Sequence, residues 1–118
     1  MTNTEKELDR LVQELHKNQR CHICGVKPAT EMHHIIGREN KILRYDLVNL
    51  LPVCHTCHCD IHDKGLEAIN FIPYAQAQYL RQIKNKSYKD ILTFELGMSE
   101  KEFLDYCKRA LKGFLSKK

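Results

Sequence analysis

The nine residues from Cys54 to His62 constrain this chain more than any other stretch. They read Cys-His-Thr-Cys-His-Cys-Asp-Ile-His and contain three cysteines and three histidines. Cys54 and Cys57 have the two-residue spacing with which a tight turn presents two thiolates to one zinc ion, and Cys21 and Cys24 repeat that spacing. The four thiolates therefore predict a structural zinc site made of sulfur alone.

The histidines of the same stretch predict a second metal site. His58 and His62 are four residues apart, so in a helix their imidazoles lie on one face, where both can bind one ion. Position 58 lies about 100° around a helix from position 57, which separates the histidine face from the thiolates. We expect one short helix, ending near Gly65, to serve both ions.

Size and composition favour a single metal-stabilised domain. The chain has 118 residues and is 42% hydrophobic, which gives only a modest core at this length. Six cysteines without an apolar leader at the charged N-terminus predict reduced thiolates in the cytoplasm rather than disulfides. No apolar stretch approaches the roughly 18 residues of a membrane helix, so we expect a soluble protein without a membrane partner.

The positive charge is concentrated at the C-terminal end. Residues 81–118 contain ten Lys or Arg and five Asp or Glu, a balance of +5, whereas residues 1–80 contain nine and ten, a balance of −1. Such an asymmetry suits contact with a polyanion such as nucleic acid, and a solvated lysine-rich surface explains it equally well.

Helical patterns flank the metal-binding stretch on both sides. Residues 4–18 have apolar positions at helical spacing after a Thr4-x-x-Glu7 capping box. Further helices are expected over residues 73–84, over residues 87–96 up to Gly97, and from Ser99 onwards. The last two resemble a helix-turn-helix in part, and an ordinary helical hairpin is the alternative.

Two short strands are expected between the cysteine pairs. Residues 30–36 are rich in β-branched and apolar types, and His33 and His34 must face opposite sides of such a strand. Residues 47–53 have a second strand-like pattern that Asn49 interrupts. A buried Asn amide can hold a loop by bridging backbone groups, although an ordinary turn Asn is the alternative.

Together these residues resemble the HNH endonucleases, a family whose ββα-metal motif places two strands and a helix around one catalytic ion. The resemblance covers residues 21–62 and rests on His33-His34, Asn49 fifteen residues after His34, His58 nine further and His62 four further. That order is similar to the histidine-rich form of the colicin DNases. The two Cys-x-x-Cys pairs look more like those of phage and bacterial HNH proteins.

The resemblance implies a role for each position. His34 would be the general base that activates water, and Asn49 would brace the loop that holds it. His33, His58 and His62 would hold one divalent ion at the scissile phosphate. The loop arginines Arg38 and Arg44 are candidate phosphate contacts, and the products would carry a 5′ phosphate and a 3′ hydroxyl.

The resemblance leaves the catalytic metal open. Many relatives have Asp before the base histidine, where this chain has His33, and an all-nitrogen site is softer than one suited to magnesium. Mg²⁺, Mn²⁺, Ni²⁺ and Zn²⁺ are all candidates beside the structural Zn²⁺.

The expected architecture is therefore a small α+β domain with an HNH ββα-metal core, a structural zinc and flanking helices. Residues 1–20 would form an N-terminal amphipathic helix, residues 21–65 the nuclease core, and residues 66–118 a basic helical segment. DNA, with branched DNA among the candidates, is the implied partner, in the cytoplasm of a bacterial host or phage-infected cell. The competing hypothesis is a non-catalytic zinc-binding module that grips nucleic acid or protein.

Overall fold

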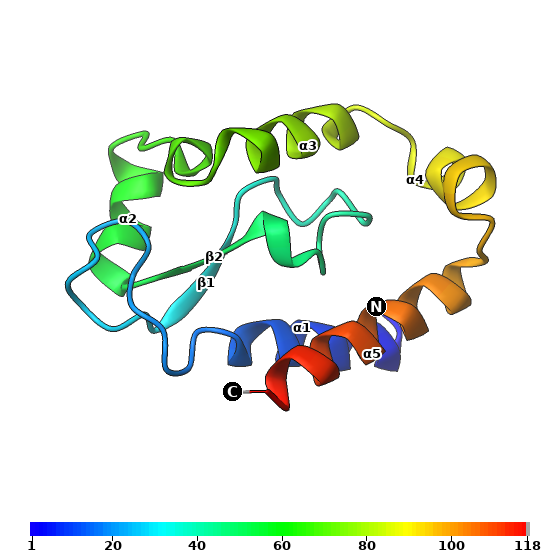
Figure 1. The fold of residues 1–118 in the computed structure, drawn as a ribbon, viewed down its shortest axis with the longest axis horizontal. Helices are drawn as coiled ribbons and strands as arrows, with labels where there is room; N and C mark the ends of the chain where they lie inside the picture. The colour runs from blue at the N-terminus through cyan, green and yellow to red at the C-terminus, as the bar shows by residue number, and fades with distance from the viewer. Residues whose placement is uncertain (118) are drawn as a thin grey trace.

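Two short antiparallel strands lie between helices that come from both ends of the chain (Figure 1). The structure is a computed structural model, and it describes residues 1–117. Strand β1, Glu31–His34, pairs with β2, Leu50–Val53, so that His34 lies opposite Leu50. Helix α2, His55–Asp63, follows β2 directly. The molecule is thus a small α+β protein, and the predicted strands over residues 30–36 and 47–53 are present in shorter form.

The first helix begins earlier than predicted. Helix α1 is Asn3–Glu14, and its capping box pairs Thr2 with Glu5 instead of Thr4 with Glu7. The Thr2 hydroxyl accepts from the Glu5 backbone N–H at 3.1 Å, and the Glu5 carboxylate accepts from the Thr2 N–H at 3.2 Å. Glu7 is therefore free to form ion pairs with the last helix.

The last helix covers the first. Helix α5, Glu100–Leu115, begins with the predicted Ser99–Glu102 capping box and packs on α1. Lys108 and Lys112 of α5 reach Glu7 at 2.9 and 3.4 Å. Helices α1 and α5 lie side by side along one edge of the molecule in Figure 1.

Helix α3, Tyr74–Lys84, lies on the opposite edge, after the 3₁₀ turn η2, Ala68–Phe71 (Figure 1). The predicted helix over residues 87–96 is present as a short α4, Tyr88–Asp90, continued by a π-helix, η3, Ile91–Leu96. It ends at Gly97, whose φ is +60°, as the glycine stop signal predicts.

The interior is divided into two apolar clusters. The larger joins α1, α5, α3 and residues 42–50; the smaller surrounds the cysteines and contains Leu51, Val53 and Ala68. Between the strands, residues 35–49 form a loop that closes with the 3₁₀ turn η1, Leu47–Asn49. Within residues 1–117, no helix is long and apolar enough to cross a bilayer.

Candidate metal centre

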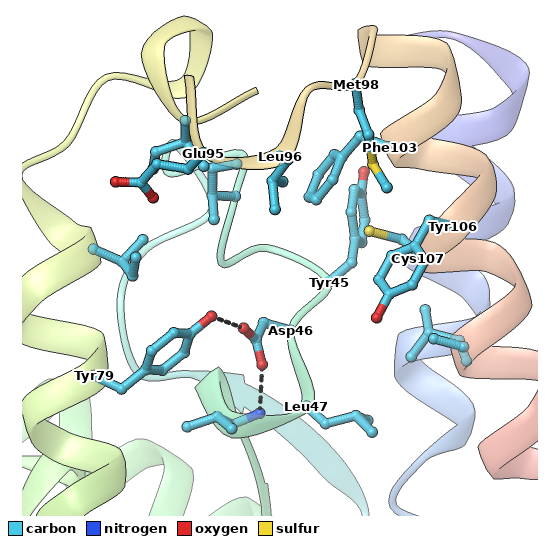
Figure 2. A pocket seen from close by; sticks show the side chains of 16 residues that line it. Tyr45, Asp46, Leu47, Tyr79, Glu95, Leu96, Met98, Phe103, Tyr106 and Cys107 are labelled. Atoms are coloured by element: carbon cyan, nitrogen blue, oxygen red, sulfur yellow. Dashed lines mark hydrogen bonds between the residues drawn. The ribbon is translucent and has the colours of Figure 1, made fainter. Parts of the chain in front are cut away.

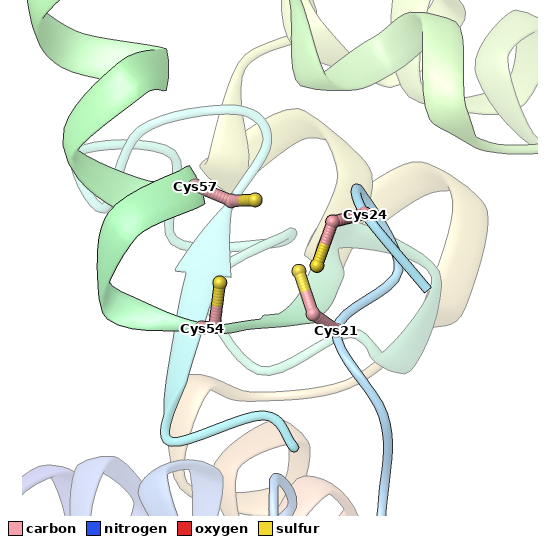
Figure 3. Close-up of side chains that lie close together, drawn as sticks. All are labelled: Cys21, Cys24, Cys54 and Cys57. Carbon is pink, nitrogen blue, oxygen red and sulfur yellow. The ribbon is translucent and has the colours of Figure 1, made fainter. Parts of the chain in front are cut away.

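Four sulfur atoms converge where the loop before β1 meets the start of α2. Cys21 and Cys24 come from the loop, Cys54 is the N-cap of α2 and Cys57 lies in its first turn. Their Sγ atoms all lie within 4.8 Å of one another, and Figure 3 shows them pointing into one space. Four sulfurs bound tetrahedrally to zinc at about 2.3 Å would be about 3.8 Å apart, so this arrangement fits a zinc ion.

The backbone around these cysteines favours thiolates. The N–H of Ile23 donates to Cys21 Sγ at 3.4 Å. Backbone N–H groups of Lys27 and Val26 lower the pKa of Cys24 to about 6. For Cys21, burial acts to raise the pKa, but three backbone N–H groups outweigh it and the pKa is lowered. Burial and the neighbouring thiols raise the pKa of Cys57 to about 12, because four adjacent sulfurs cannot all ionise without a cation.

A second cluster of three histidines lies on the other side of α2. His33 of β1 faces His58 and His62, one helical turn apart on α2, and their ligand nitrogens lie within 4.8 Å of one another. His33 Nδ1 and His58 Nε2 are 3.2 Å apart. Two nitrogens bound tetrahedrally at about 2.1 Å would be about 3.4 Å apart, so this pair fits a shared ion.

The histidine cluster is suited to neutral imidazoles. Burial, together with the charges of His58 and His62, lowers the pKa of His33 to about 4. Its ring therefore offers a lone pair at neutral pH, which is the form that binds a metal. The three rings meet with centroids 5.0 to 5.6 Å apart.

Glu31 is a functional candidate that the sequence analysis missed. Its Oε1 accepts a hydrogen bond from His58 Nδ1 at 2.6 Å, and its Oε2 lies 3.0 Å from His55 Nδ1. A proton on His58 Nδ1 leaves the Nε2 lone pair directed at the cluster, the usual arrangement of a carboxylate behind a metal-binding histidine. The hydrogen bond from His58 is the main cause of the lowered pKa of Glu31. The available signal was that Glu31 and His33 are two apart on a strand and share a face.

His34 is not a member of the three-histidine cluster, as the different environments of adjacent strand residues predict. Its Nε2 lies 3.0 Å from the backbone oxygen of Arg44. A carbonyl can only accept, so Nε2 carries the proton and Nδ1 keeps a free lone pair. Burial, with the charges of Arg38 and Arg44, lowers the pKa of His34 despite that hydrogen bond. The residue is thus a fixed, neutral imidazole.

Asn49 ties the loop that carries this carbonyl. The side chain is fully buried, and its Oδ1 accepts from the Ile36 N–H at 2.7 Å. Its Nδ2 donates to the backbone oxygens of Ile36 and Leu43, both at 3.0 Å. The amide therefore bridges both ends of the loop, which confirms the expected bracing and excludes an ordinary turn Asn.

The two loop arginines differ in what they contact. Arg38 is exposed and lines an open groove of about 530 Å³ together with His58 and His62. Arg44 instead forms a two-point ion pair with Asp9 of α1, at 2.7 and 3.1 Å. The phosphate contact expected of Arg44 stays a prediction, and its side chain fastens the loop to α1.

Comparisons with protein-family models, with curated proteins and with solved structures find no match to this chain. What the geometry establishes is a four-cysteine cluster compatible with a structural metal and a histidine triad able to bind a second ion.

Proposed function

We propose that this chain is a metal-dependent DNA endonuclease of the HNH type. The observation that carries the proposal is the adjacency of two different histidine environments on one strand. His33 belongs to a triad suited to a metal ion, while His34 has one nitrogen fixed by a backbone carbonyl and the other free. A purely structural metal site has no need of a second, neutral imidazole with a free nitrogen beside it.

The proposed chemistry begins at His34. Its Nδ1 accepts a proton from a water molecule while the water oxygen bonds to phosphorus and the bond from phosphorus to the 3′ oxygen breaks. The departing 3′ oxygen takes a proton from solvent water, so the products are a 5′ phosphate and a 3′ hydroxyl. Asn49 keeps the loop carbonyl of Arg44 in place, and through it the ring of His34. Arg38, at the edge of the groove, offers a guanidinium to a phosphate oxygen.

His33, His58 and His62 would hold the divalent ion. When bound, such an ion supplies Lewis-acid stabilisation of the negative charge on the phosphate and the leaving oxygen. Glu31 keeps His58 in the required tautomer, and β1 and α2 fix the separation of the three nitrogens. The four cysteines hold the start of α2, so a structural zinc would preorganise the same helix.

Two histidine variants test the proposal, because one should lose cleavage alone and the other should lose both cleavage and metal binding. His34→Ala removes the base and no metal ligand, so metal content should persist while cleavage falls by about 10²- to 10⁴-fold. His58→Ala should reduce both metal occupancy at the triad and cleavage. His22→Ala, at an exposed position outside both clusters, is the matched control and should leave both unchanged.

The assay uses plasmid and branched DNA with Mg²⁺, Mn²⁺, Ni²⁺ and Zn²⁺ in turn. Cleavage by His34→Ala at the parent rate would remove His34 from the mechanism. If the parent protein binds DNA and cuts neither substrate with any of the four ions, the non-catalytic zinc-binding module is the better account.

A further inference from the structure

A cavity lined by apolar side chains lies away from both metal clusters. It is a bowl of about 710 Å³ between α3 and α5, with residues 42–48 beneath it and residues 91–98 closing one end. Figure 2 shows Asp46 near its centre, with Tyr79 of α3 on one side and Tyr106 of α5 on the other. This volume falls within the range of about 300–1,000 Å³ that is typical of small-molecule sites.

The lining is mostly apolar, and several of its large side chains are exposed to solvent. Around the mouth, Leu47, Leu96 and Tyr106 are 40%, 44% and 52% exposed. Deeper in the bowl, Phe103 and Leu111 are buried and provide a wall that has no polar atoms. A ligand with an apolar body would remove this surface from water.

Asp46 gives the bowl an uncompensated negative charge. Its Oδ1 accepts from the Val48 N–H at 2.9 Å and its Oδ2 accepts from the Tyr79 hydroxyl at 2.5 Å. Both donors are neutral, and within residues 1–117 no Lys, Arg or His nitrogen lies within 4.0 Å of this carboxylate. Glu95, the other acid of the lining, already pairs with Lys86 at 2.8 Å. An ionised carboxylate has about four acceptor sites, so Asp46 can still accept from a cation.

A buried hydroxyl beneath the bowl is also unpartnered. Tyr45 is 5% exposed, and its hydroxyl has no hydrogen-bond partner among residues 1–117. In Figure 2 this hydroxyl lies near Met98 and Phe103 in the wall of the cavity. Such a group is usually satisfied in native proteins, which indicates that the cavity is built to be filled.

We propose that this bowl binds a small organic cation, a protonated amine carried on an apolar aromatic or aliphatic body. The ammonium group lies against the Asp46 carboxylate, between Tyr79 of α3 and Tyr106 of α5. The apolar body fills the space against Phe103 and Leu111. This binding site is independent of the proposed nuclease chemistry and shares no residue with the proposed nuclease site.

The absence of tryptophan from the chain permits a direct test with indole probes. Tryptamine, tryptophol and indole-3-propionate have the same ring with a positive, a neutral and a negative head group. Their fluorescence anisotropy, excited beyond the tyrosine absorption, reports binding to the zinc-loaded full chain. Tryptamine should bind at least about tenfold more tightly than tryptophol, and indole-3-propionate should bind least.

Three variants locate the effect. In Asp46→Asn, the amide oxygen can still accept from the Val48 N–H and the amide N–H can donate to the Tyr79 hydroxyl oxygen, while the negative charge is lost. This variant should bring tryptamine to the affinity of tryptophol. Glu95→Gln, the matched control at an acid that is already paired, should preserve the preference. Ala110→Phe places a ring in the bowl from α5 and should abolish binding of all three probes. Circular dichroism confirms that each variant is folded.

Equal binding of the three probes by the parent chain would overturn the recognition of a cation, as would a preference that survives in Asp46→Asn. Failure of all three probes to bind would overturn the site itself. Sedimentation of the parent as a dimer that Ala110→Phe dissociates would overturn it as well, because a second copy would then occupy the bowl.

Discussion

Asn49 makes three hydrogen bonds to the backbone from a fully buried position. In Asn49→Ala, the Ile36 N–H and the oxygens of Ile36 and Leu43 lose these partners beside a fully buried position. We expect the free energy of unfolding in urea to fall by about 3 kcal/mol, since each buried unsatisfied group costs about 1–3 kcal/mol. Asn70→Ala, at an exposed Asn, should change it by less than about 0.5 kcal/mol. Equal stability of the two variants would show that the bridge contributes nothing.

Among residues that do not themselves bind the ion, Glu31 should have the largest effect on the metal affinity of the histidine triad. Glu31→Gln keeps the size and an acceptor for His58 Nδ1 but removes the charge. We expect the affinity of the histidine triad for Co²⁺ to fall by about 10- to 100-fold, the usual effect of altering a partner of a metal-binding histidine. Titration followed by the visible Co²⁺ spectrum measures this. An unchanged affinity would mean that the 2.6 Å contact does not orient His58.

At the residue scale, sequence spacing predicted those features that depend only on the local geometry of a strand or a loop. His33 and His34 had to diverge because they are adjacent on a strand, and Asn49 had to be satisfied because it interrupts an apolar run. The contacts of Glu31 with His58 and of Arg44 with Asp9 were not predicted, because these partners are 27 and 35 residues away in sequence. Strand periodicity indicates that Glu31 shares a face with His33, but it does not identify a partner on another element.

The junction between η3 and α5 depends on Gly97. Its φ of +60° lies in the left-handed region, so Gly97→Ala should lower the free energy of unfolding by about 1–2 kcal/mol. Gly113, inside α5, has open space at the position of a Cβ atom. Gly113→Ala should therefore raise the free energy of unfolding by about 0.5 kcal/mol. Urea unfolding of both variants tests the pair. Effects of the same sign would contradict the assignment of these two backbone conformations.

The sequence predicted the presence of the helices more reliably than it predicted where each begins or which type of helix it is. Two overlapping Thr-x-x-Glu patterns precede α1, and only the ion pairs of Glu7 with α5 distinguish them. The π-helical turn at Ile91–Leu96 was not predictable from apolar spacing, because an α-helix and a π-helix differ little over six residues. The bowl beside it depends on how α3, η3 and α5 pack, which no single segment encodes.

At the scale of the whole molecule, removal of the zinc ion should unfold the chain. The smaller apolar cluster is built around three of the four thiolates, so the chain should unfold when a strong chelator extracts the metal. Circular dichroism and bound-zinc analysis measure this together. Cys54→Ser should lose zinc, whereas Cys59→Ser, outside the four-sulfur cluster, should retain it. Full zinc content in Cys54→Ser would refute the assignment.

The basic C-terminal segment is also part of the core. Lys86, Lys108 and Lys112 form ion pairs with acids of the chain, and α5 buries Phe103, Leu104 and Leu111. Deletion of residues 87–118 would therefore remove part of the interior as well as positive charge. Substitution of exposed residues such as Lys101 and Arg109 separates the two effects.

Cys57 and His58 are neighbours in the chain that belong to different clusters. An inserted residue between them would rotate everything beyond by about 100° and displace it by about 1.5 Å along the axis. The sulfurs would stay together, while His58 and His62 would no longer face His33. Substitutions along α2 can accumulate one at a time during evolution, but insertions and deletions within its first two turns cannot. Any descendant of this chain that keeps both clusters must keep the number of residues from Cys54 to His62 unchanged.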